Sequence, residues 1–456
     1  MSQYGKTNFI NMSHHVNNML EKALEEIIVE FQKSGIPDMF DRELNVPIDI
    51  ESVVTIVGLR RVGKTYYLYQ VIKNLLKKGV ERQRIFYINF EDERLENITS
   101  RDLSKIVEIY YKMNPAVKNG YFFFDEIQNV PSWERFVRRL AEKKGFRIFL
   151  TGSSSKLLSK EIATALRGRT ISFNLLPLSF REFVGAKGID TTEPLTEMER
   201  GMIKMCLDEF VKYGGFPELL GYDKNVKLRM LKEYLDLIIY RDLIERYGIE
   251  KVAALKFMIR LLVRNFSREL SVRKLYNFLK SSNISLSKNK VYEYFSYLED
   301  MNFIFLIRRY GRGKEVERSI PKIYLCDVGF ATLQGVQDIG RRMENIVGLE
   351  LLRRKEYFEP MIEIYYWKDT SGREVDFVIK MGQRIEELIQ VCYDLDDPNT
   401  KSREFAGLLK ASSELKCKKL SIITWETEGT EKFNGVEIKF VPLWKWLLDV
   451  EISVNN

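Results

Sequence analysis

Histidine is almost absent from this chain of 456 residues, and cysteine is rare. The two histidines, His14 and His15, stand side by side near the start, which disfavours catalysis or metal binding by histidine. The four cysteines lie far apart and form no C-x-x-C pair. Such spacing disfavours zinc sites and a disulfide framework and favours a reducing compartment. We therefore expect a cytoplasmic protein.

Long apolar runs are also missing. The sequence contains no stretch of about 18 apolar residues, which is the length that a membrane-spanning helix needs. Residues 1–18 lack the basic-then-apolar layout of a secretory signal. With 45% hydrophobic and 30% charged residues, the composition is that of a globular protein, and the length predicts about three domains. We expect no membrane partner.

The positive charge of the chain is concentrated in one segment. The formal net charge is +8, and residues 251–330 contain 16 Lys and Arg against seven Asp and Glu. The remainder of the chain is therefore close to neutral. A basic segment of this kind favours an anionic partner such as nucleic acid.

The strongest motif is Gly58 to Thr65, which matches the phosphate-binding pattern G-x-x-x-x-G-K-[ST] at every fixed position. A β-branched run, Val53 to Val57, precedes it, and an amphipathic helix over Tyr66 to Lys78 follows. Strand, loop and helix are the context that this motif requires. The predicted nucleotide-binding residues are Gly58, Leu59, Arg60, Arg61, Val62, Gly63, Lys64, Thr65 and Tyr66.

The chemistry of the loop implies ATP and Mg²⁺ as cofactors. Lys64 would bind the β- and γ-phosphates, and the Thr65 hydroxyl would ligate Mg²⁺. A second signal is the aromatic run over 121–124, followed by Asp125 and Glu126. Asp125 would support the metal and Glu126 would orient the attacking water. Glu91, at the end of the strand over 84–90, is either a further acid of this site or part of a helix cap.

The loop and the Asp-Glu strand together resemble the additional-strand P-loop ATPases, including the AAA+ proteins. In that family this acidic pair marks a hydrolysing enzyme. The resemblance implies a γ-phosphate sensor at Ser153 or Ser154, although these hydroxyls could equally cap a helix. It also implies an arginine finger at Arg167 or Arg169, acting in cis or from another subunit, although either could pair with a surface acid.

Later phrases, Tyr213 to Glu218 and Tyr240 to Asp242, resemble one prokaryotic ATPase family, widespread in archaea, over nearly the whole chain from about residue 50. That family joins an AAA+-like domain to a winged helix and a nuclease-like domain. The implied fold class is α/β, with a P-loop core, a helical lid, a winged helix and a restriction-endonuclease-like end. The corresponding domains are 1–45, 46–185, 186–250, 251–330 and 335–456.

The basic segment predicts two helices around a turn, then two strands around a basic glycine loop, which is the order of a winged helix. Lys288, Lys290 and Tyr292 would lie on its recognition helix. Arg309, Arg312 and Lys314 would lie on its wing. We expect DNA as the partner of this segment, and protein contact through a solvated basic face is the alternative.

The last segment resembles a PD-(D/E)xK nuclease core, in which Glu350 and Asp376 would bind a divalent metal. The acid and lysine of its third strand fall on Gln390 and Cys392. Cysteine supplies no cation, and nothing in the sequence requires Lys368 or Lys380 to replace the lysine. We expect an inactive nuclease-like domain.

These patterns predict an Mg²⁺-dependent ATPase whose nucleotide state controls DNA engagement by the basic segment. The alternatives are an ATP-regulated, metal-dependent DNA nuclease and a nucleotide-switched protein scaffold. The AAA+ resemblance is also compatible with a homo-oligomer, whose subunit number the sequence does not give.

Overall fold

The computed structural model describes five stretches of the chain and divides it into two compact units. The first unit is Met1–Leu59 with Gly63–Leu175, and the second is Arg60–Val62 with Leu176–Asn456. No helix among the described residues is both long and apolar enough to cross a bilayer. The described residues are 19–152, 168–311, 313–395, 397–433 and 435–449.

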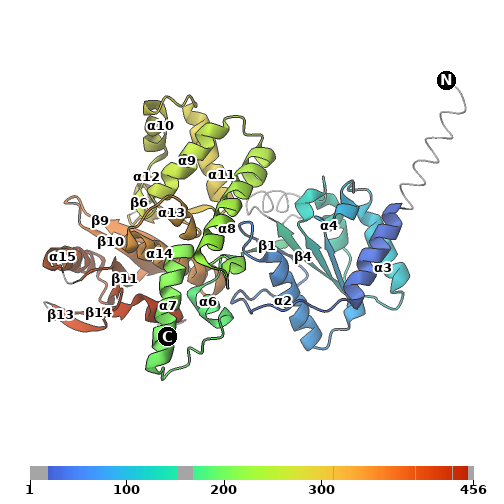
Figure 1. Cartoon of the computed structure of the whole chain (residues 1–456), viewed down its shortest axis with the longest axis horizontal. Coiled ribbons are helices and arrows are strands. Elements are labelled where there is room, and N and C mark those ends of the chain that lie inside the picture. Colours follow the sequence, from blue (N-terminus) through green and yellow to red (C-terminus); the bar gives the residue numbers. More distant parts are fainter. Residues whose placement is uncertain (1–18, 153–167, 312, 396, 434, 450–456) are drawn as a thin grey trace, which may run out of the picture. The chain divides into compact units, whose positions relative to one another are not determined.

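The first unit is built on a five-stranded, fully parallel sheet in the order β2-β3-β4-β1-β5 (Figure 1). Its strands are β-branched or aromatic runs, and most of their side chains are buried, as expected for a sheet covered on both faces. The strands are β1 (Val53–Val57), β2 (Ile85–Asn89), β3 (Gly120–Asp125), β4 (Phe146–Gly152) and β5 (Thr170–Asn174).

Helices cover this sheet and share its apolar core. A helix over 19–33 contributes Leu24 and Ile28 to a cluster that also contains α3 and α4 side chains and strand residues such as Phe122 and Phe124. The helical elements are α2 (Lys64–Lys77), η1 (Arg82–Arg84), η2 (Glu93–Leu95), α3 (Leu103–Met113), η3 (Ile127–Asn129) and α4 (Glu134–Ala141).

The strand order places the predicted site. β4 lies between β1, which leads into the glycine-rich loop, and β3, which ends at Asp125. Because all strands are parallel, their carboxyl ends lie at one edge of the sheet, where ligands bind in open α/β folds. The predicted α/β architecture with a parallel sheet is confirmed.

The second unit begins with helices and continues through the basic segment. α7 starts with a capping box between Thr196 and Glu199 and ends at Gly214, whose φ of +77° only glycine adopts readily. These elements are α6 (Phe180–Ala186), α7 (Glu197–Tyr213), η4 (Pro217–Leu219), α8 (Lys224–Leu237), the π-helix η5 (Ile238–Glu245), α9 (Val252–Arg264), β6 (Arg268–Glu269), α10 (Val272–Ser281), α11 (Lys288–Asp300), β7 (Ile304–Arg309), α12 (Lys314–Arg318) and β8 (Lys322–Leu325).

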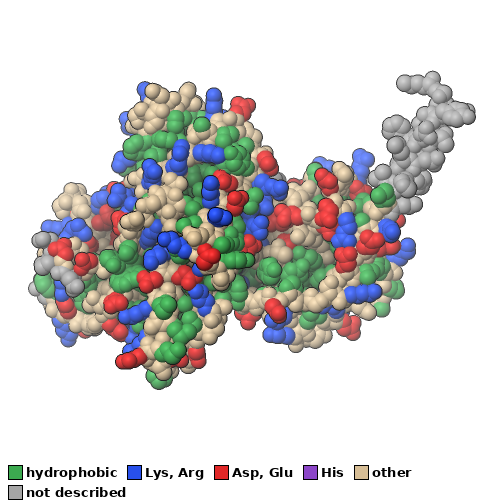
Figure 2. Space-filling model, in the orientation of Figure 1, with side chains coloured by type: hydrophobic (Ala, Val, Ile, Leu, Met, Phe, Trp, Pro, Cys, Tyr) green, Lys and Arg blue, Asp and Glu red, His purple; other side chains and the backbone are tan. Residues whose placement is uncertain are grey.

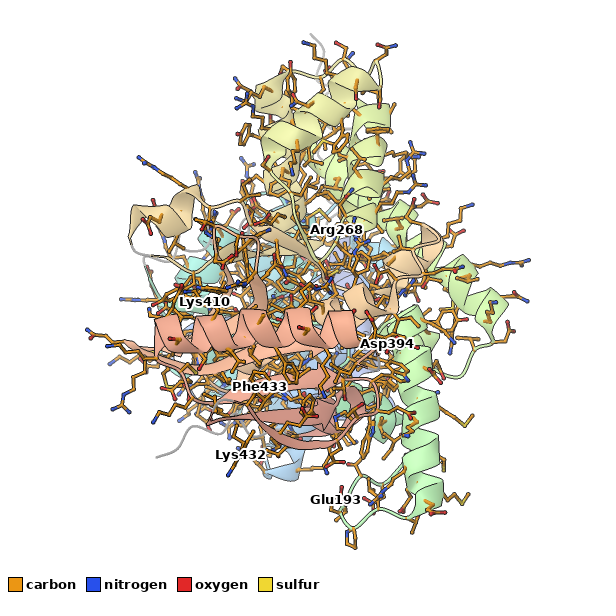
Figure 3. All side chains as sticks on the ribbon, turned by 90° about the vertical axis from the view of Figure 1, so that its left-hand side faces the viewer. Glu193, Arg268, Asp394, Lys410, Lys432 and Phe433 are labelled. Atoms are coloured by element: carbon orange, nitrogen blue, oxygen red, sulfur yellow. The ribbon has the colours of Figure 1, made fainter. Side chains whose placement is uncertain are left out.

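The C-terminal part packs helices against a mixed sheet. Figure 3 shows α15, which carries Lys410, lying across the strands of this sheet. Helix α14 is buried along most of its length. The elements are α13 (Gly329–Leu333), α14 (Ile339–Tyr357), β9 (Ile362–Lys368), β10 (Glu374–Met381), β11 (Arg384–Cys392), α15 (Pro398–Leu415), β12 (Leu420–Thr424), β13 (Gly429–Phe433), β14 (Val436–Pro442) and α16 (Leu443–Leu448).

One continuous sheet joins the basic segment to this C-terminal part. Its nine strands run in the order β13-β14-β12-β11-β10-β9-β7-β8-β6. The junction is a parallel pairing of β7 with β9, in which Arg308 and Arg309 face Tyr365 and Tyr366. The strands expected to form an independent wing are therefore part of the sheet that carries Asp376.

Candidate nucleotide-binding site

The glycine-rich loop turns directly into α2. Gly63 caps this helix with a φ of +93°, a left-handed conformation that side chains disfavour. Lys64 and Thr65 are the first two residues of the helix. The helix N-terminus offers backbone N–H groups and a positive dipole to an anion.

The Lys64 side chain contacts the loop that precedes the helix. Its ammonium is 3.3 Å from the Gly58 carbonyl oxygen and 3.4 Å from that of Leu59. It also lies 3.4 Å from the Glu126 carboxylate. A phosphate bound at the helix N-terminus would meet this ammonium, and the Glu126 carboxylate would lie close to it.

Asp125 gathers three hydroxyl donors at the end of β3. The Thr65 hydroxyl donates to it at 2.8 Å and the Tyr87 hydroxyl at 2.9 Å, and Thr151 also donates. Burial, and after it the neighbouring Glu126 charge, raise the pKa of the Asp125 carboxyl. A carboxylate and a hydroxyl this close supply the hard oxygen ligands that Mg²⁺ prefers, so the residues fit the predicted metal.

Glu126 is held in an unusual backbone conformation. Its φ is +51°, and its backbone N–H donates to the Thr151 hydroxyl at 2.8 Å. Its carboxylate accepts a hydrogen bond from Gln128 in addition to the Lys64 ion pair. Left-handed non-glycine residues are uncommon and concentrate at functional sites. The backbone therefore directs this carboxylate toward the loop.

The remaining predicted loop residues are placed differently. Arg60–Val62 group with the second unit, where Arg60 pairs with Asp242 at 3.1 Å and Arg61 with Glu218 at 3.0 Å. Leu59 is buried, and Tyr66 is 53% exposed. These two acids, Glu218 and Asp242, belong to the sequence segments 213–218 and 240–242, on which the family resemblance rests.

Most of the predicted sensor and finger residues fall outside the described part of the chain. Ser153, Ser154 and Arg167 lie outside the described residues. Arg169 is exposed, and its backbone carbonyl accepts from Val53 where β5 joins β1. Glu91 is exposed, while the adjacent Asp92 caps η2. The finger and sensor assignments stay predictions, and capping is what the structure shows for this acidic stretch.

Two residues of the site were not among the predicted ones. Thr151, at the end of β4, contacts Asp125 with its side chain and the Glu126 backbone with the same oxygen. Tyr87, on β2, reaches Asp125 from the neighbouring strand. Thr151 carried a signal, because it is the polar residue that follows an apolar strand at the edge where ligands bind. Tyr87 carried none, because a tyrosine in a buried strand is usually a core residue.

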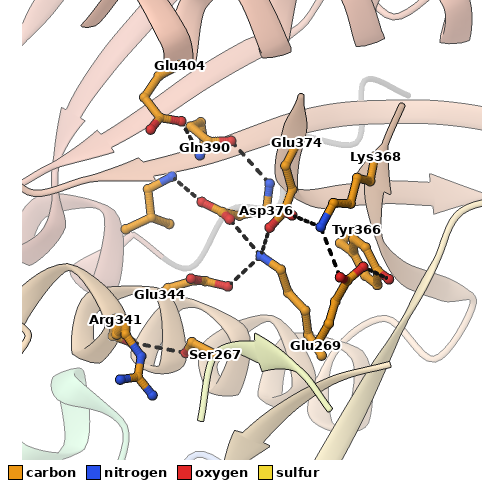
Figure 4. Close-up of polar contacts among 12 residues, drawn as sticks. Ser267, Glu269, Arg341, Glu344, Tyr366, Lys368, Glu374, Asp376, Gln390 and Glu404 are labelled. Atoms are coloured by element: carbon orange, nitrogen blue, oxygen red, sulfur yellow. Dashed lines mark hydrogen bonds and ion pairs between the residues drawn. The ribbon is translucent and has the colours of Figure 1, made fainter. Parts of the chain in front are cut away.

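The second unit contains another buried polar cluster (Figure 4). Asp376 on β10 and Glu344 on α14 both accept hydrogen bonds from Lys322 on β8, each at 2.9 Å. Asp376 also accepts from the Val391 backbone, and its own backbone N–H donates to Gln390. The cluster thus connects the basic segment with the C-terminal part of the chain.

Glu350, the predicted partner of Asp376, lies elsewhere. It pairs with Arg181, at 2.7 Å, and with Arg353 and Arg354, at 3.2 Å each. Glu350 lies six positions after Glu344, so the two side chains leave the helix on different faces. The pairing of Glu350 with Asp376 is corrected to a pairing of Glu344 with Lys322 and Asp376.

Neither lysine considered as a substitute contacts Asp376 among the interactions of the described residues. Lys368 pairs with Glu269 and Glu374, and Lys380 pairs with Glu363. Lys322 contacts Asp376 instead. A signal for Lys322 existed in the sequence, because a lysine that opens an apolar strand must find a partner once the strand is buried.

Family models match three successive parts of the chain. A domain described as "AAA domain" matches residues 51–184. Two domains of unknown function match residues 206–338 and 339–446. The uncharacterized protein MJ1544 of Methanocaldococcus jannaschii is 40% identical over 444 residues, which cover 95% of this chain and 97% of that protein.

The chain belongs to the same family as MJ1544. Another relative, an uncharacterized protein of Haemophilus influenzae, is 30% identical over 404 residues, covering 87% of this chain and 94% of that protein. The AAA domain encloses the glycine-rich loop, Asp125, Glu126 and Thr151. In this family, therefore, the first unit carries an AAA-type P-loop domain.

Two solved structures match part of the chain at low sequence identity. The Aeropyrum pernix ORC1 protein in complex with DNA is 13% identical, with a TM-score of 0.25, and the match covers 70% of this chain and 91% of that one. CDC6p from Pyrobaculum aerophilum is 12% identical, with a TM-score of 0.24, and the match covers 65% and 88%.

Proposed function

We propose that this protein is an Mg²⁺-dependent ATPase. The observation that carries the proposal is the meeting of Lys64 with Glu126 and of Thr65 with Asp125 at one edge of the parallel sheet. Four side chains from two distant motifs converge there with the roles that phosphoryl transfer requires. The AAA domain that spans them supports the same conclusion.

Each of these residues has a distinct task. Lys64 and the first N–H groups of α2 bind the terminal phosphates. Thr65 and Asp125 would hold Mg²⁺, which would supply positive charge to offset the negative charge of the transferred phosphoryl group. Glu126 orients the attacking water and accepts its proton. Thr151 keeps Asp125 and the Glu126 backbone in register, because one hydroxyl contacts both.

Replacing Glu126 with Gln tests this assignment. We expect turnover of ATP in the presence of Mg²⁺ to fall at least about 100-fold, because the amide cannot accept the water proton. Nucleotide affinity should stay within a few-fold of wild type, since Glu126 does not hold the phosphates. Phosphate release and equilibrium binding of a fluorescent nucleotide would measure the two quantities. Equal turnover in wild type and variant would contradict the proposal.

We further propose that the 251–330 segment binds DNA. In the structure α9, β6, α10, α11, β7 and β8 follow the element order of a winged helix. Lys288, Lys290 and Tyr292 are all exposed on α11. Figure 2 shows Lys and Arg side chains spread over the part of the second unit that α9 to α11 form. Such a surface favours a polyanion bound through its phosphates.

The segment predicted to form the wing differs from the expected one. Arg309 is exposed at the end of β7, Arg312 lies outside the described residues, and Lys314 starts the short helix α12. The connection between β7 and β8 therefore contains a helix, and the extended glycine loop that we expected is absent from its described part. We place the principal DNA contacts on α11.

A double substitution, Lys288→Ala with Lys290→Ala, tests the DNA surface. We expect the slope of log affinity for duplex DNA against log salt to fall by about 2, because each lost phosphate contact removes about 0.9. Fluorescence anisotropy at several salt concentrations measures this slope. Lys432→Ala is the matched control, because Lys432 is an exposed lysine of the C-terminal sheet. An unchanged slope in the double variant would favour protein contact through α11.

In this proposal the nucleotide state controls DNA engagement, and the C-terminal domain does not cut DNA. ATP turnover with and without duplex DNA tests the coupling, with the DNA inspected for cuts. We expect turnover to rise with DNA and the DNA to remain whole. Metal-dependent cuts that persist in Glu126→Gln would instead place a second catalytic activity in the C-terminal domain.

A further inference from the structure

The nuclease resemblance implies a divalent metal among the acids of the C-terminal core. The acids around Asp376 are arranged differently. We propose that the Lys322 ammonium is the resident cation of the Glu344, Glu374 and Asp376 cluster and takes the place of a divalent metal ion. The inference deepens the proposed absence of cleavage and does not depend on the ATPase site.

The first argument is the geometry around the Lys322 nitrogen. It lies 2.9 Å from Glu344, 2.9 Å from Asp376 and 2.5 Å from Glu374. An ammonium has three N–H donors, and three carboxylates receive them. Mg²⁺ would require oxygens at about 2.0–2.1 Å. The acids are thus arranged around an ammonium at hydrogen-bonding distances.

The second argument is that the same carboxylates already receive other donors. Glu344 accepts from the Tyr324 hydroxyl at 2.8 Å, and Asp376 accepts from the Val391 backbone at 3.0 Å. Glu374 pairs with Lys368 at 3.2 Å. With the side chains as they lie in the structure, where Lys322 occupies the centre of the cluster, no group of three His, Cys, Asp or Glu among the described residues is arranged to hold a metal ion.

Gln390 provides the third argument. It stands where the nuclease pattern has its third-strand acid, and its amide oxygen would be the metal ligand. That oxygen accepts from the Asp376 backbone N–H at 3.2 Å, and its amide nitrogen donates to Glu404 at 2.6 Å. Gln390 is 5% exposed, so both ends of its amide are committed inside the protein. It orders the cluster rather than offering a ligand.

Burial completes the picture. Lys322 is 3% exposed, and although burial disfavours its charge, Asp376 and Glu344 raise its pKa well above the ordinary value. Glu344, Glu374, Asp376, Gln390 and Glu404 line a cavity of about 740 Å³, and Lys322 is not among its lining residues. The lysine therefore neutralises the acids from the protein side and does not reach a substrate in the cavity.

Lys322 and the three acids that it contacts belong to different segments of the chain. Lys322 is on β8, in the segment matched at 206–338, while Glu344, Glu374 and Asp376 lie in the segment matched at 339–446. A metal would need only the latter segment. The ion pairs instead join the two, so the cluster fastens the basic segment to the C-terminal sheet.

Substituting Lys322 with Met tests the inference through metal binding. We expect nucleotide-free Lys322→Met to bind one Mn²⁺ with a dissociation constant at least tenfold below that of wild type, because the buried Glu344 and Asp376 and the half-buried Glu374 lose their cation. The melting temperature of the second unit should then rise with Mn²⁺ in this variant alone. Titration calorimetry and scanning calorimetry measure the two effects on the full-length chain.

Two variants tie the result to this site. Lys322→Met with Asp376→Asn should bind no additional Mn²⁺, and neither should Lys368→Met, which removes a cation from Glu374 alone. If Lys322→Met folds only with Mn²⁺, and the double variant does not respond to Mn²⁺, the inference also holds. These readouts do not involve ATP turnover, so failure of the ATPase assignment would leave them unchanged.

Three results would overturn the inference. One is Mn²⁺ binding by wild type that equals that of Lys322→Met and is lost in Asp376→Asn. Another is folded Lys322→Met that gains no Mn²⁺ site. The third is metal-dependent DNA cleavage by wild type that both Lys322→Met and Asp376→Asn abolish, which would make Lys322 a catalytic lysine.

Discussion

Replacing Lys64 with Ala should lower kcat/KM for ATP by about 1,000-fold, the loss expected when a preorganised charge is removed from a buried site. In the proposed mechanism Lys64 acts on both binding and chemistry, because the same ammonium would meet the terminal phosphates before and during transfer. Nucleotide affinity and turnover should therefore fall together. Glu126→Gln, by contrast, should lower turnover alone, so the two variants distinguish the two roles.

The structure sharpens the prediction for Lys64. Its ammonium is held by two loop carbonyls and by Glu126, so its removal leaves Glu126 without that positive neighbour. Lys77→Ala is the matched control, because Lys77 is an exposed lysine in the last turn of the same helix. Fluorescent-nucleotide binding and phosphate release measure both variants. Undiminished affinity in Lys64→Ala would contradict the assignment of the loop.

The sequence predicts those parts of this site whose residues are close together in the chain. The strand over 53–57 and the loop after it are local, and β1 has the predicted bounds. The acidic end of β3 was equally readable, because four aromatic residues precede two carboxylates. The meeting of Thr65 with Asp125 followed from the parallel order of the strands.

The helix acid of the C-terminal core could not be chosen from the sequence. Amphipathic periodicity identifies the inward face of a helix only when the other face meets water. In α14 nearly every residue from Arg342 to Arg354 is buried, including both Glu344 and Glu350. The burial pattern does not distinguish two acids on a helix that is buried all round. Lys322, which contacts Glu344, and Arg181, which contacts Glu350 together with Arg353 and Arg354, lie outside this helix.

The continuous nine-stranded sheet could not be predicted from the sequence for a similar reason. β7 and β9 pair through residues 308–309 and 365–366, and neither strand carries a local signal for the other. Because the sequence suggested two separate domains, Lys322 had no expected neighbour beyond its own segment. Long-range strand pairing is set by packing between elements, which local patterns do not encode.

The double glycine in the phrase over 213–218 has a physical explanation in Asp327. This aspartate is 2% exposed and accepts hydrogen bonds from the Gly215 and Gly329 backbones, each at 2.7 Å. A Cβ on Gly214 would lie 1.7 Å from its carboxylate. The carboxylate therefore fixes the end of α7 against the start of α13, and glycine is required where it approaches the backbone.

Asp327→Ala should therefore destabilise the second unit by about 3–5 kcal/mol, because two buried N–H groups lose their acceptor at about 1–3 kcal/mol each and a cavity remains. Urea unfolding followed by circular dichroism measures the loss. Asp223→Ala is the control, because Asp223 is exposed and caps α8, and its removal should cost about 1 kcal/mol. Equal losses in the two variants would contradict the role of Asp327.

The cost of Asp327→Ala should also depend on pH. Burial raises the pKa of this carboxyl to about 7, against about 3.9 in an unfolded chain. The folded protein thus binds the extra proton between about pH 4 and pH 7, and the stabilisation by Asp327 declines as pH rises through that window. The difference in unfolding free energy between wild type and Asp327→Ala should be larger at pH 5 than at pH 8. A difference that grows with pH would mean that the two backbone N–H groups stabilise the carboxylate more than burial opposes it.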